Sequence, residues 1–340
     1  MKISKYLVQD YGVDLGTANT IITHQDTIIV NEPSIIAVDN QNRKLLAVGK
    51  EAMDMHEKTH EHIKTIKPLK DGVIADYYAT EQMIRGFLQK AIHQKFFLGR
   101  KRFLICIPYA TTEVEKRAVR DSAQGVGASE LYMIHEPIAA AVGMGLDVTQ
   151  AEGKMVVDIG GGTTEIVILS LSGIVCSQSL RVAGNTFDID IIDYVRRNYN
   201  LLIGERTAEK IKIEAGAVLD DLDNPPPPLK IVGRDLMTGI PKAVSITHHD
   251  VVNMLDKSIS KIIEGILHTL EVCPPELAAD VYDYGIYLTG GGAYLRGLDK
   301  RISRITKLKV KIAPEPLLSV MKGVDICLKN LDKNKHLLLN

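Results

Sequence analysis

The stretch Met155-Val-Val-Asp-Ile-Gly-Gly-Gly-Thr-Thr-Glu-Ile-Val-Ile-Leu169 is an apolar run that stops at Asp158, passes through three glycines and resumes as an apolar run. This order is typical of a strand, a tight turn and a second strand. Gly160, Gly161 and Gly162 can adopt backbone angles closed to other residues, so their N–H groups can point into one concavity and bind phosphate oxygens. Asp158 would face the same place, where a carboxylate suits a divalent cation held through water. Alone, however, a glycine-rich hairpin is more often just a turn.

The same pattern occurs a second time near the N-terminus. Asp14-Leu-Gly-Thr-Ala-Asn-Thr20 matches Asp158-Ile-Gly-Gly-Gly-Thr-Thr164, with Asp, Gly and Thr at equivalent places and apolar residues before it. A repeated unit of this kind indicates a duplicated domain. A third glycine cluster, Leu288-Thr-Gly-Gly-Gly-Ala293, follows a third apolar run. Two opposed hairpins that grip phosphates, with a glycine turn beside the nucleoside, form the arrangement of an actin-type nucleotide cleft.

Composition fits this interpretation without deciding it. A chain of 340 residues is long for one core and suits two domains. The apolar share of 45% and charged share of 24% are typical of a soluble globular protein, and a net charge of −1 gives no overall attraction to nucleic acid or membrane. No segment is apolar enough to span a bilayer, and the N-terminus lacks the apolar core of a signal peptide.

The four cysteines are far apart in sequence and show no CxxC or His-paired spacing. They are Cys106, Cys176, Cys273 and Cys327. Most lie in apolar runs. Buried thiols of a reducing cytosol are therefore expected, rather than metal ligands or disulfides.

Three glycine motifs, the pair Glu136-Pro137 and a helix around Glu209 occur in an order that resembles the actin superfamily. Within it, the chain resembles the MreB/Mbl group of bacterial cell-shape proteins, from Asp14 to about Leu331. The resemblance implies an α/β, actin-like (duplicated ribonuclease-H-like) ATPase fold, with two domains of one large and one small subdomain each around a nucleotide cleft. The expected boundaries are 1–32 with 65–140 and 314–340 (first large), 33–64 (first small), 141–182 with 247–313 (second large) and 183–246 (second small).

The resemblance also implies ATP or ADP and Mg²⁺ as cofactors and assigns residues to them. Asp14 and Asp158 would hold the metal through its water shell. The phosphate-binding residues would be Thr17, Ala18 and Asn19 in the first domain and Gly160, Gly161, Gly162 and Thr163 in the second. The nucleoside would contact Glu209, Lys210, Ile211, Lys212, Gly290, Gly291, Gly292 and Ala293.

Glu136 is the candidate catalytic residue. Pro137 favours a helix start, so Glu136 is expected at a strand-to-helix junction. A carboxylate there either caps the helix or positions a water molecule, and the residue type alone favours the cap. In the family, this Glu orients or deprotonates the water that attacks the γ-phosphate, assisted by the residue that corresponds to Thr163. His135 departs from the family pattern, in which many relatives have an acidic residue, and it is expected to alter the hydrolysis rate while leaving binding intact.

Glu209 and Lys212 lie three positions apart on one face of an expected helix. On their own they indicate a surface ion pair. The family instead uses this Glu and Lys to contact ribose and adenine, and the resemblance favours that role here.

A membrane contact is expected at Phe96, Phe97 and Leu98, which stand between Lys95 and the basic residues 100–102. These apolar side chains would either cap the core or insert among lipid headgroups, with the cations meeting anionic lipid. The residues leave both alternatives open. The resemblance favours the membrane, because the family carries an apolar membrane-inserting loop at this place.

Other segments give more local expectations. Residues 21–30 read as one returning strand, residues 51–62 as a helix and residues 332–340 as a loose tail. Thr112 and Glu115 predict a capping box for a helix over 113–124, and Thr247 is expected to cap a long helix. The four prolines at 225–228 suit a stiff spacer, although such runs can also dock partner domains.

The expected function is that of an ATP-dependent, membrane-associated actin-like filament protein that organises cell-wall synthesis and determines rod shape. Hydrolysis would be slow, by in-line attack of water on the γ-phosphate, and coupled to assembly rather than metabolic. The expected partners are further copies of the chain, the inner membrane surface, a membrane-spanning adaptor and the cell-wall synthesis machinery, with no nucleic acid. Location would be cytoplasmic, peripheral on the inner face of the membrane. The alternative is a non-polymerising actin-fold ATPase, of the chaperone type or a small-molecule kinase.

Overall fold

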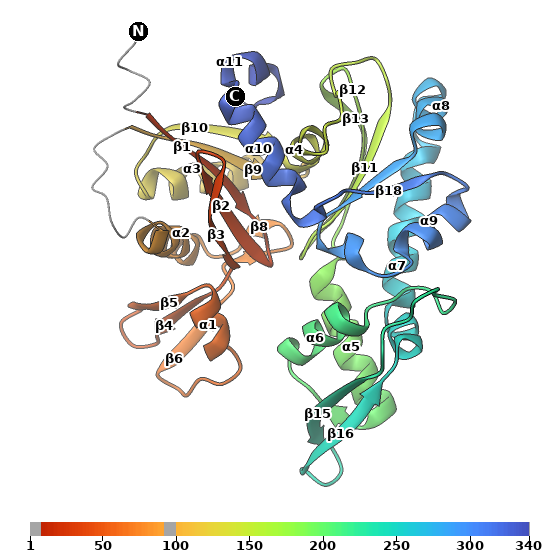
Figure 1. Cartoon of the computed structure of the whole chain (residues 1–340). Helices are drawn as coiled ribbons and strands as arrows, with labels where there is room; N and C mark the ends of the chain where they lie inside the picture. The colour runs from red at the N-terminus through yellow and green to blue at the C-terminus, as the bar shows by residue number, and fades with distance from the viewer. Residues whose placement is uncertain (1–7, 92–99, 340) are drawn as a thin grey trace. The chain divides into compact units, whose positions relative to one another are not determined.

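The computed structural model describes residues 8–91 and 100–339, and the chain divides into two compact units (Figure 1). Unit 1 comprises residues 1–151, 170–174 and 317–340. Unit 2 comprises residues 152–169 and 175–316. Each unit contains one five-stranded sheet and one three-stranded sheet among the described residues.

The large sheet of unit 1 has the order β10-β9-β1-β2-β3. Its strands are β1 (Val8–Leu15), β2 (Asn19–His24), β3 (Thr27–Pro33), β9 (Arg100–Ile107) and β10 (Ala128–His135). β1 to β3 form antiparallel hairpins, whereas β9 and β10 run parallel to β1. The register aligns Asp14 with Cys106, and Cys106 with Ile134. The carboxyl ends of three parallel strands therefore meet at one edge, where α/β sheets bind ligands.

The expectation of one returning strand over residues 21–30 is wrong. The chain reverses at Gln25 and Asp26, whose φ values of 50° and 63° are left-handed, and this reversal separates β2 from β3. Asp adopts this left-handed conformation more readily than most residues. The turn therefore forms without a glycine and gives no glycine signal in the sequence.

Four helices pack around the large sheet of unit 1: α2 (Tyr77–Ala91), α3 (Glu113–Gly125), α4 (Glu136–Gly143) and α10 (Ser319–Lys329). The predicted capping box of α3 is confirmed, because Thr112 and Glu115 each bond the other's backbone N–H. α4 and α10 cross at Gly143 and Gly323, where a Cβ atom on either residue would overlap the backbone of the other helix. Glycine is therefore required on both sides of this crossing.

The small sheet of unit 1 has the order β5-β4-β6, with β4 (Ile36–Asp39), β5 (Leu45–Val48) and β6 (Ile63–Ile66). Beside it lie α1 (Lys50–Met55) and the two-stranded β7 (Leu69–Lys70) and β8 (Val73–Ile74). The helix expected over residues 51–62 is wrong in its second half. His56 is extended and Glu57 has a φ of 62°, so α1 ends and the chain turns back to add β6 to the sheet.

The large sheet of unit 2 has the order β13-β12-β11-β17-β18. Its strands are β11 (Lys154–Ile159), β12 (Thr164–Ser170), β13 (Gly173–Leu180), β17 (Ile286–Thr289) and β18 (Val310–Ile312). β11 and β12 form an antiparallel hairpin, and β17 runs parallel to β11, which aligns Asp158 with Thr289. Unit 2 thus repeats the arrangement of unit 1, in which a strand pairs with an antiparallel return on one side and a parallel strand on the other.

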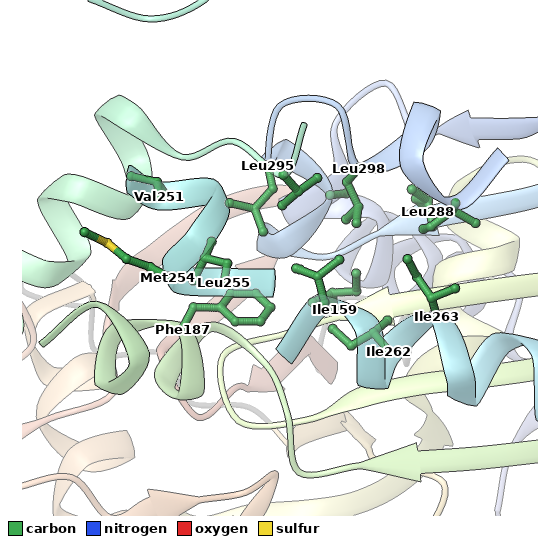
Figure 2. Packing of buried hydrophobic residues seen from close by; sticks show 14 of the residues in the cluster. Ile159, Phe187, Val251, Met254, Leu255, Ile262, Ile263, Leu288, Leu295 and Leu298 are labelled. Carbon is green, nitrogen blue, oxygen red and sulfur yellow. The ribbon is translucent and has the colours of Figure 1, made fainter. Parts of the chain in front are cut away.

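The helices of unit 2 are α5 (Gly184–Tyr199), α6 (Glu205–Ala215), α7 (His248–Glu271), α8 (Pro275–Tyr284) and α9 (Leu298–Thr306). A small sheet joins β14 (Leu201–Leu202), β15 (Leu229–Asp235) and β16 (Pro241–Ile246). Thr247 caps α7 as predicted. The apolar face of α7 is buried with Ile159, Phe187 and Leu288 in one core (Figure 2). Burial of this apolar face holds the long helix on the sheet.

The C-terminal segment is ordered through Leu339, contrary to the expectation of a loose tail. α10 continues into α11 (Leu331–Asn334) and a 3₁₀ turn, η4 (Lys335–Leu337). Leu337 is buried, and the Leu339 N–H donates to the carbonyl oxygen of Met133 in β10. Short 3₁₀ turns also occur at η2 (Gly291–Tyr294) and η3 (Pro316–Leu318).

Candidate functional site

The turn between β1 and β2, hairpin 1 (residues 15–20), is fastened from behind by Ser34. The Ser34 hydroxyl donates to the carbonyl oxygen of Gly16 at 2.6 Å and lies 2.8 Å from Thr20 Oγ1. The Ser34 N–H donates to the carbonyl oxygen of Ala18 at 2.9 Å. In a trans peptide the N–H points opposite to the carbonyl. The N–H groups of Thr17 and Asn19 therefore point away from Ser34.

The Thr17 side chain has a structural partner. It is 8% exposed, and its hydroxyl oxygen accepts a 2.9 Å hydrogen bond from the N–H of Gly72. Ala18 is half-buried and Asn19 is exposed. The backbone of hairpin 1, more than its side chains, therefore has the geometry to bind an anion.

Asp14 lies at the end of β1, just before hairpin 1. Burial raises the pKa of its carboxyl to about 6, against a hydrogen bond from the Cys106 thiol that lowers it. The same thiol lies 3.2 Å from the carbonyl oxygen of Val13. Burial also raises the pKa of Cys106 well above its ordinary value, and the charges of Asp14 and Glu136 add to this effect. Asp14, Cys106 and Glu136 thus form one electrostatic cluster in unit 1.

Glu136 is the first residue of α4, and His135 occupies the N-cap position. Glu136 therefore does not occupy the N-cap position that its residue type alone favoured. Its charge lies in the first turn, where the helix dipole favours an anion. The His135 ring packs edge-on against Tyr109, with centroids 5.0 Å apart. Burial lowers the pKa of His135, as does the charge of Lys116, so the imidazole is neutral near pH 7.

A small hollow of about 20 Å³ opens beside this cluster, between Leu15, Gly72, Cys106, Pro108 and Glu115. This volume is enough for about one water molecule. Its polar wall comes from the start of α3 and the end of β9.

The turn between β11 and β12, hairpin 2 (residues 159–164), is fastened by backbone. Gly160 N–H donates to the carbonyl oxygen of Thr163 at 2.9 Å, which closes the turn. The carbonyl oxygens of Gly160 and Gly161 accept from the N–H groups of Gly184 (3.1 Å) and Asn185 (2.7 Å). These donors are the first residues of α5. By peptide planarity, the N–H groups of Gly161 and Gly162 point away from α5.

The third glycine turn lies directly against hairpin 2. Gly290 has a φ of 78°, and a Cβ atom there would overlap the Asp158 carboxylate and the Ile159 carbonyl oxygen. At Gly292 a Cβ atom would overlap the Ile159 side chain. Glycine at both positions is a requirement of this close packing. The turn is held on its far side by Thr289, whose hydroxyl donates to the carbonyl oxygen of Pro316 at 3.0 Å.

The expected nucleoside-binding helix is α6. Glu209 and Lys210 are exposed, whereas Ile211 is completely buried in the core of unit 2. Lys212 pairs with Asp188 of α5 at 2.8 Å, rather than with Glu209, and also donates to the carbonyl oxygen of Gly184 at 3.1 Å. Lys212 therefore anchors α6 to the end of α5 that supports hairpin 2. No local signal in the sequence pointed to Asp188 or Ser34, because their partners lie 24 and 18 residues away.

The residues assigned to magnesium suit an ion that keeps its water. Among residues 8–91 and 100–339, no group of three or more His, Cys, Asp or Glu side chains could hold a metal directly. Asp14 lies beside hairpin 1 in unit 1, and Asp158 lies beside hairpin 2 in unit 2. Mg²⁺ typically binds through one or two carboxylates and substrate phosphates and retains several waters, so a carboxylate beside a hairpin, in either unit, is a donor that fits it.

The apolar membrane segment Phe96, Phe97 and Leu98 lies outside the described residues. Within the described part of the chain, none of the helices combines the length and apolarity that crossing a bilayer requires.

Known proteins match over almost the whole chain. The model of the MreB/Mbl protein family matches residues 8–336. The cell shape-determining protein MreB of Escherichia coli (strain K12) is 43% identical over 330 residues, covering 95% of this chain and 94% of the relative. The cell shape-determining protein Mbl of Bacillus cereus (strain ATCC 10987 / NRS 248) is 44% identical over 326 residues, covering 96% and 97%.

Solved structures give the same result. MreB5 of Spiroplasma citri bound to AMPPNP is 37% identical, with a TM-score of 0.91 and coverage of 96% of this chain and 98% of that one. A MamK double helical filament, at 21% identity and a TM-score of 0.78 over 96% and 99%, shares the fold. The chain has the actin-like fold and belongs to the MreB/Mbl family.

Proposed function

We propose that this protein is an ATP-dependent, actin-like filament protein that determines cell shape. One observation, common to both hairpins, carries the proposal. Carbonyl groups of each turn accept hydrogen bonds from the supporting residues, and two N–H groups of each turn point to the opposite side. Such pairs of aligned N–H groups bind phosphate. Family membership supports the proposal, since curated relatives are named cell shape-determining proteins. The MreB5 structures carry AMPPNP and ADP.

In this proposal the residues of each unit bind part of the nucleotide. Thr17, Ala18 and Asn19 hold phosphate from hairpin 1, as Gly160 to Thr163 do from hairpin 2. Asp14 and Asp158 would hold Mg²⁺ through water, and the ion would supply positive charge against the phosphates. Glu209, Lys210, the Ile211 backbone and Lys212, with Gly290 to Ala293, take the nucleoside. The proposed subdomain boundaries are those expected from the sequence.

Hydrolysis requires a water molecule aimed in line with the γ-phosphate. We assign this task to Glu136, with Thr163 assisting. Glu136 projects from the first turn of α4, which the Ala139–Gly323 crossing fixes against α10. His135, neutral and packed on Tyr109, adds no negative charge beside it. We propose that this reaction is slow and coupled to filament assembly.

The test of the catalytic assignment is Glu136→Gln. General-base or water-positioning groups contribute roughly 10²- to 10⁴-fold, so phosphate release should fall by at least about a hundredfold while ATP binding persists. Glu130→Gln is the matched control, because Glu130 lies on the strand that leads to Glu136 and pairs with Arg100 only at 3.9 Å. Unchanged turnover in Glu136→Gln would remove Glu136 from catalysis.

We further propose that the filaments lie on the inner membrane surface through Phe96, Phe97 and Leu98, with a membrane-spanning adaptor and the cell-wall synthesis machinery as partners. The test is sedimentation with anionic liposomes, with and without ATP and magnesium. A threshold concentration for pelleting with ATP supports assembly, and its loss in a variant with Ser at 96 and 97 supports the membrane contact. A protein that stays monomeric in every condition would instead be a non-polymerising ATPase of the fold.

A further inference from the structure

Two cysteines that are 97 residues apart in sequence (273 − 176) meet in unit 2. Cys176 lies on the edge strand β13, and Cys273 follows the end of α7. The Cys176 Sγ lies 3.9 Å from the carbonyl oxygen of Val272, the residue before Cys273, and Cys176 is near enough to raise the pKa of the Cys273 thiol. The other two cysteines, Cys106 and Cys327, lie in unit 1. The contact is a pairing that the spacing in the sequence did not reveal.

The packing of α7 on β13 explains why the thiols meet. At Gly265 the helix comes so close that an added Cβ atom would lie 2.8 Å from Leu180 Cδ1 and 3.4 Å from Gln178 Oε1. Cys273 follows Gly265 by eight residues, the last two of them past the end of α7 at Glu271, a path of about 12 Å at helical rise. Four residues of strand back from Leu180 cover about 13 Å. The two stretches end beside each other, because the Cys176 Sγ approaches the carbonyl oxygen of Val272, so the closeness of the two cysteines follows from the packing of α7 on β13.

The two thiols differ in exposure. Cys273 is 8% exposed and belongs to the core of unit 2. Cys176 is half-buried, with Sγ 3.9 Å from the carbonyl oxygen of Val272. Val175 and Val272 beside it are 47% and 56% exposed. A small oxidant can therefore reach Cys176 first and finds Cys273 behind it.

We propose that Cys176 and Cys273 form a peroxide-sensitive dithiol, in which Cys176 is oxidised first and Cys273 resolves it to a disulfide. The Cys176 thiolate attacks the O–O bond of a hydroperoxide, ROOH, giving a sulfenic acid and, after proton uptake, ROH. The Cys273 sulfur then displaces the sulfenic oxygen as water, forming the S–S bond. Two thiols lose two electrons and two protons, and the peroxide is reduced to ROH and water.

The surroundings of each thiol suit its role. Burial, and after it the neighbouring Cys176 and Asp280, raise the pKa of Cys273 to about 11, so Cys273 is protected from direct oxidation. Its attack on the sulfenic acid is possible because Cys176 lies beside the residue that precedes Cys273, which gives a high effective concentration of the thiol. The disulfide would tie β13 to α7 across a long loop of chain and stabilise unit 2.

The direct test uses the unmodified protein. It is treated with hydrogen peroxide, denatured, alkylated with iodoacetamide and digested without reductant. We expect a peptide pair joined through Cys176 and Cys273, two hydrogens lighter than the sum of the reduced peptides. Cys106 and Cys327 should stay alkylated and serve as internal controls. Disulfide-linked dimers through Cys176, or a sulfinic acid at Cys176 with Cys273 still alkylated, would overturn the proposal.

Two variants separate the steps. Cys273→Ser should accumulate a sulfenic acid at Cys176 that dimedone traps, whereas Cys176→Ser should give neither the sulfenic acid nor the disulfide. The wild-type melting temperature should rise by several degrees on oxidation and return on reduction, with no rise in Cys273→Ser. Equal rises in wild type and Cys273→Ser would contradict the disulfide. The mass measurement on the wild type stands even where a variant does not fold.

Discussion

Hairpin 1 and hairpin 2 arise from matching sequence motifs but are supported in different ways. Hairpin 1 depends on a side chain as well as backbone, since the Ser34 hydroxyl donates to the Gly16 carbonyl oxygen and the Ser34 N–H donates to that of Ala18. Hairpin 2 depends on backbone, since the N–H groups of Gly184 and Asn185 bond its carbonyl oxygens. In both, the peptide planes leave outward N–H groups. A local motif thus specifies the direction of the N–H groups. The hydrogen bonds that hold the carbonyl groups can come from a side chain or from backbone.

The largest expected difference comes from adding one methyl group to each hairpin. At Gly16 a Cβ atom would lie 2.6 Å from the Asn19 carbonyl oxygen, which is backbone and cannot rotate away, whereas at Gly160 it would lie 3.3 Å from that of Thr163. Overpacking of this kind costs up to about 3 kcal/mol. We expect Gly16→Ala to lose about that much free energy of unfolding and to weaken nucleotide binding more than tenfold. Gly160→Ala should lose well under half as much.

Urea denaturation and nucleotide titration of both variants measure this comparison. Equal losses would mean that the two turns are equally crowded, and would contradict the difference in packing on which this prediction rests.

The second prediction concerns Asp14, whose pKa is raised to about 6 by burial, against an unfolded value near 3.8. The folded state therefore binds this proton more tightly than the unfolded chain. Above pH 6 the ionised carboxylate destabilises the nucleotide-free fold, by about 2 kcal/mol after allowance for solvent. As pH falls through 6 toward 4, the folded state is protonated first and the destabilisation disappears.

Asp14→Asn should therefore raise the free energy of unfolding at pH 7.5 without nucleotide, and the gap to wild type should shrink to about a third of that value by pH 4.5. Chemical denaturation of wild type and variant at both pH values measures this gap. The other titrating groups are present in both proteins, so their contributions cancel in the difference. A gap that widens at low pH would refute the raised pKa.

The support of hairpin 1 is tested by Ser34→Ala. The change leaves the Gly16 carbonyl oxygen and Thr20 without a buried partner, which should cost about 1.5 kcal/mol and loosen the hairpin. Ser129→Ala is the matched control, since its hydroxyl also donates to a backbone carbonyl, of Lys101, but at the surface. A loss no larger in Ser34→Ala than in Ser129→Ala would show that hairpin 1 does not need this side chain.

The sequence predicted what local patterns can encode. Both hairpins, the capping box at Thr112 and the helix cap at Thr247 depend on residues within a few positions of each other, and all were expected correctly. The turn at Gln25 and Asp26 was missed because left-handed residues there are not glycine. Ser34 and Asp188 were missed because a side chain that bonds a distant backbone group leaves no periodic signal. The contact of Cys176 with Cys273 was missed for the same reason.

The smallest expected effect concerns Lys212. It tests whether Lys212 stabilises hairpin 2 or only contacts the ligand. Lys212 bonds Asp188 and the Gly184 carbonyl oxygen, and the Gly184 N–H in turn bonds hairpin 2. Lys212→Gln should therefore lower the free energy of unfolding without nucleotide by about 1 kcal/mol, because this pair is only partly exposed. Lys210→Gln, on the exposed face of the same helix, should leave it unchanged.

Both lysines have been assigned to the nucleoside, so nucleotide affinity alone cannot distinguish their roles. Stability without nucleotide can, because a residue that only contacts ligand has no effect when the ligand is absent. If Lys212→Gln weakens ATP binding but leaves the nucleotide-free protein as stable as wild type, Lys212 acts as a ligand contact and hairpin 2 stands on α5 alone. If both fall together, hairpin 2 also depends on a side chain, one step further from the phosphates than Ser34 is in hairpin 1.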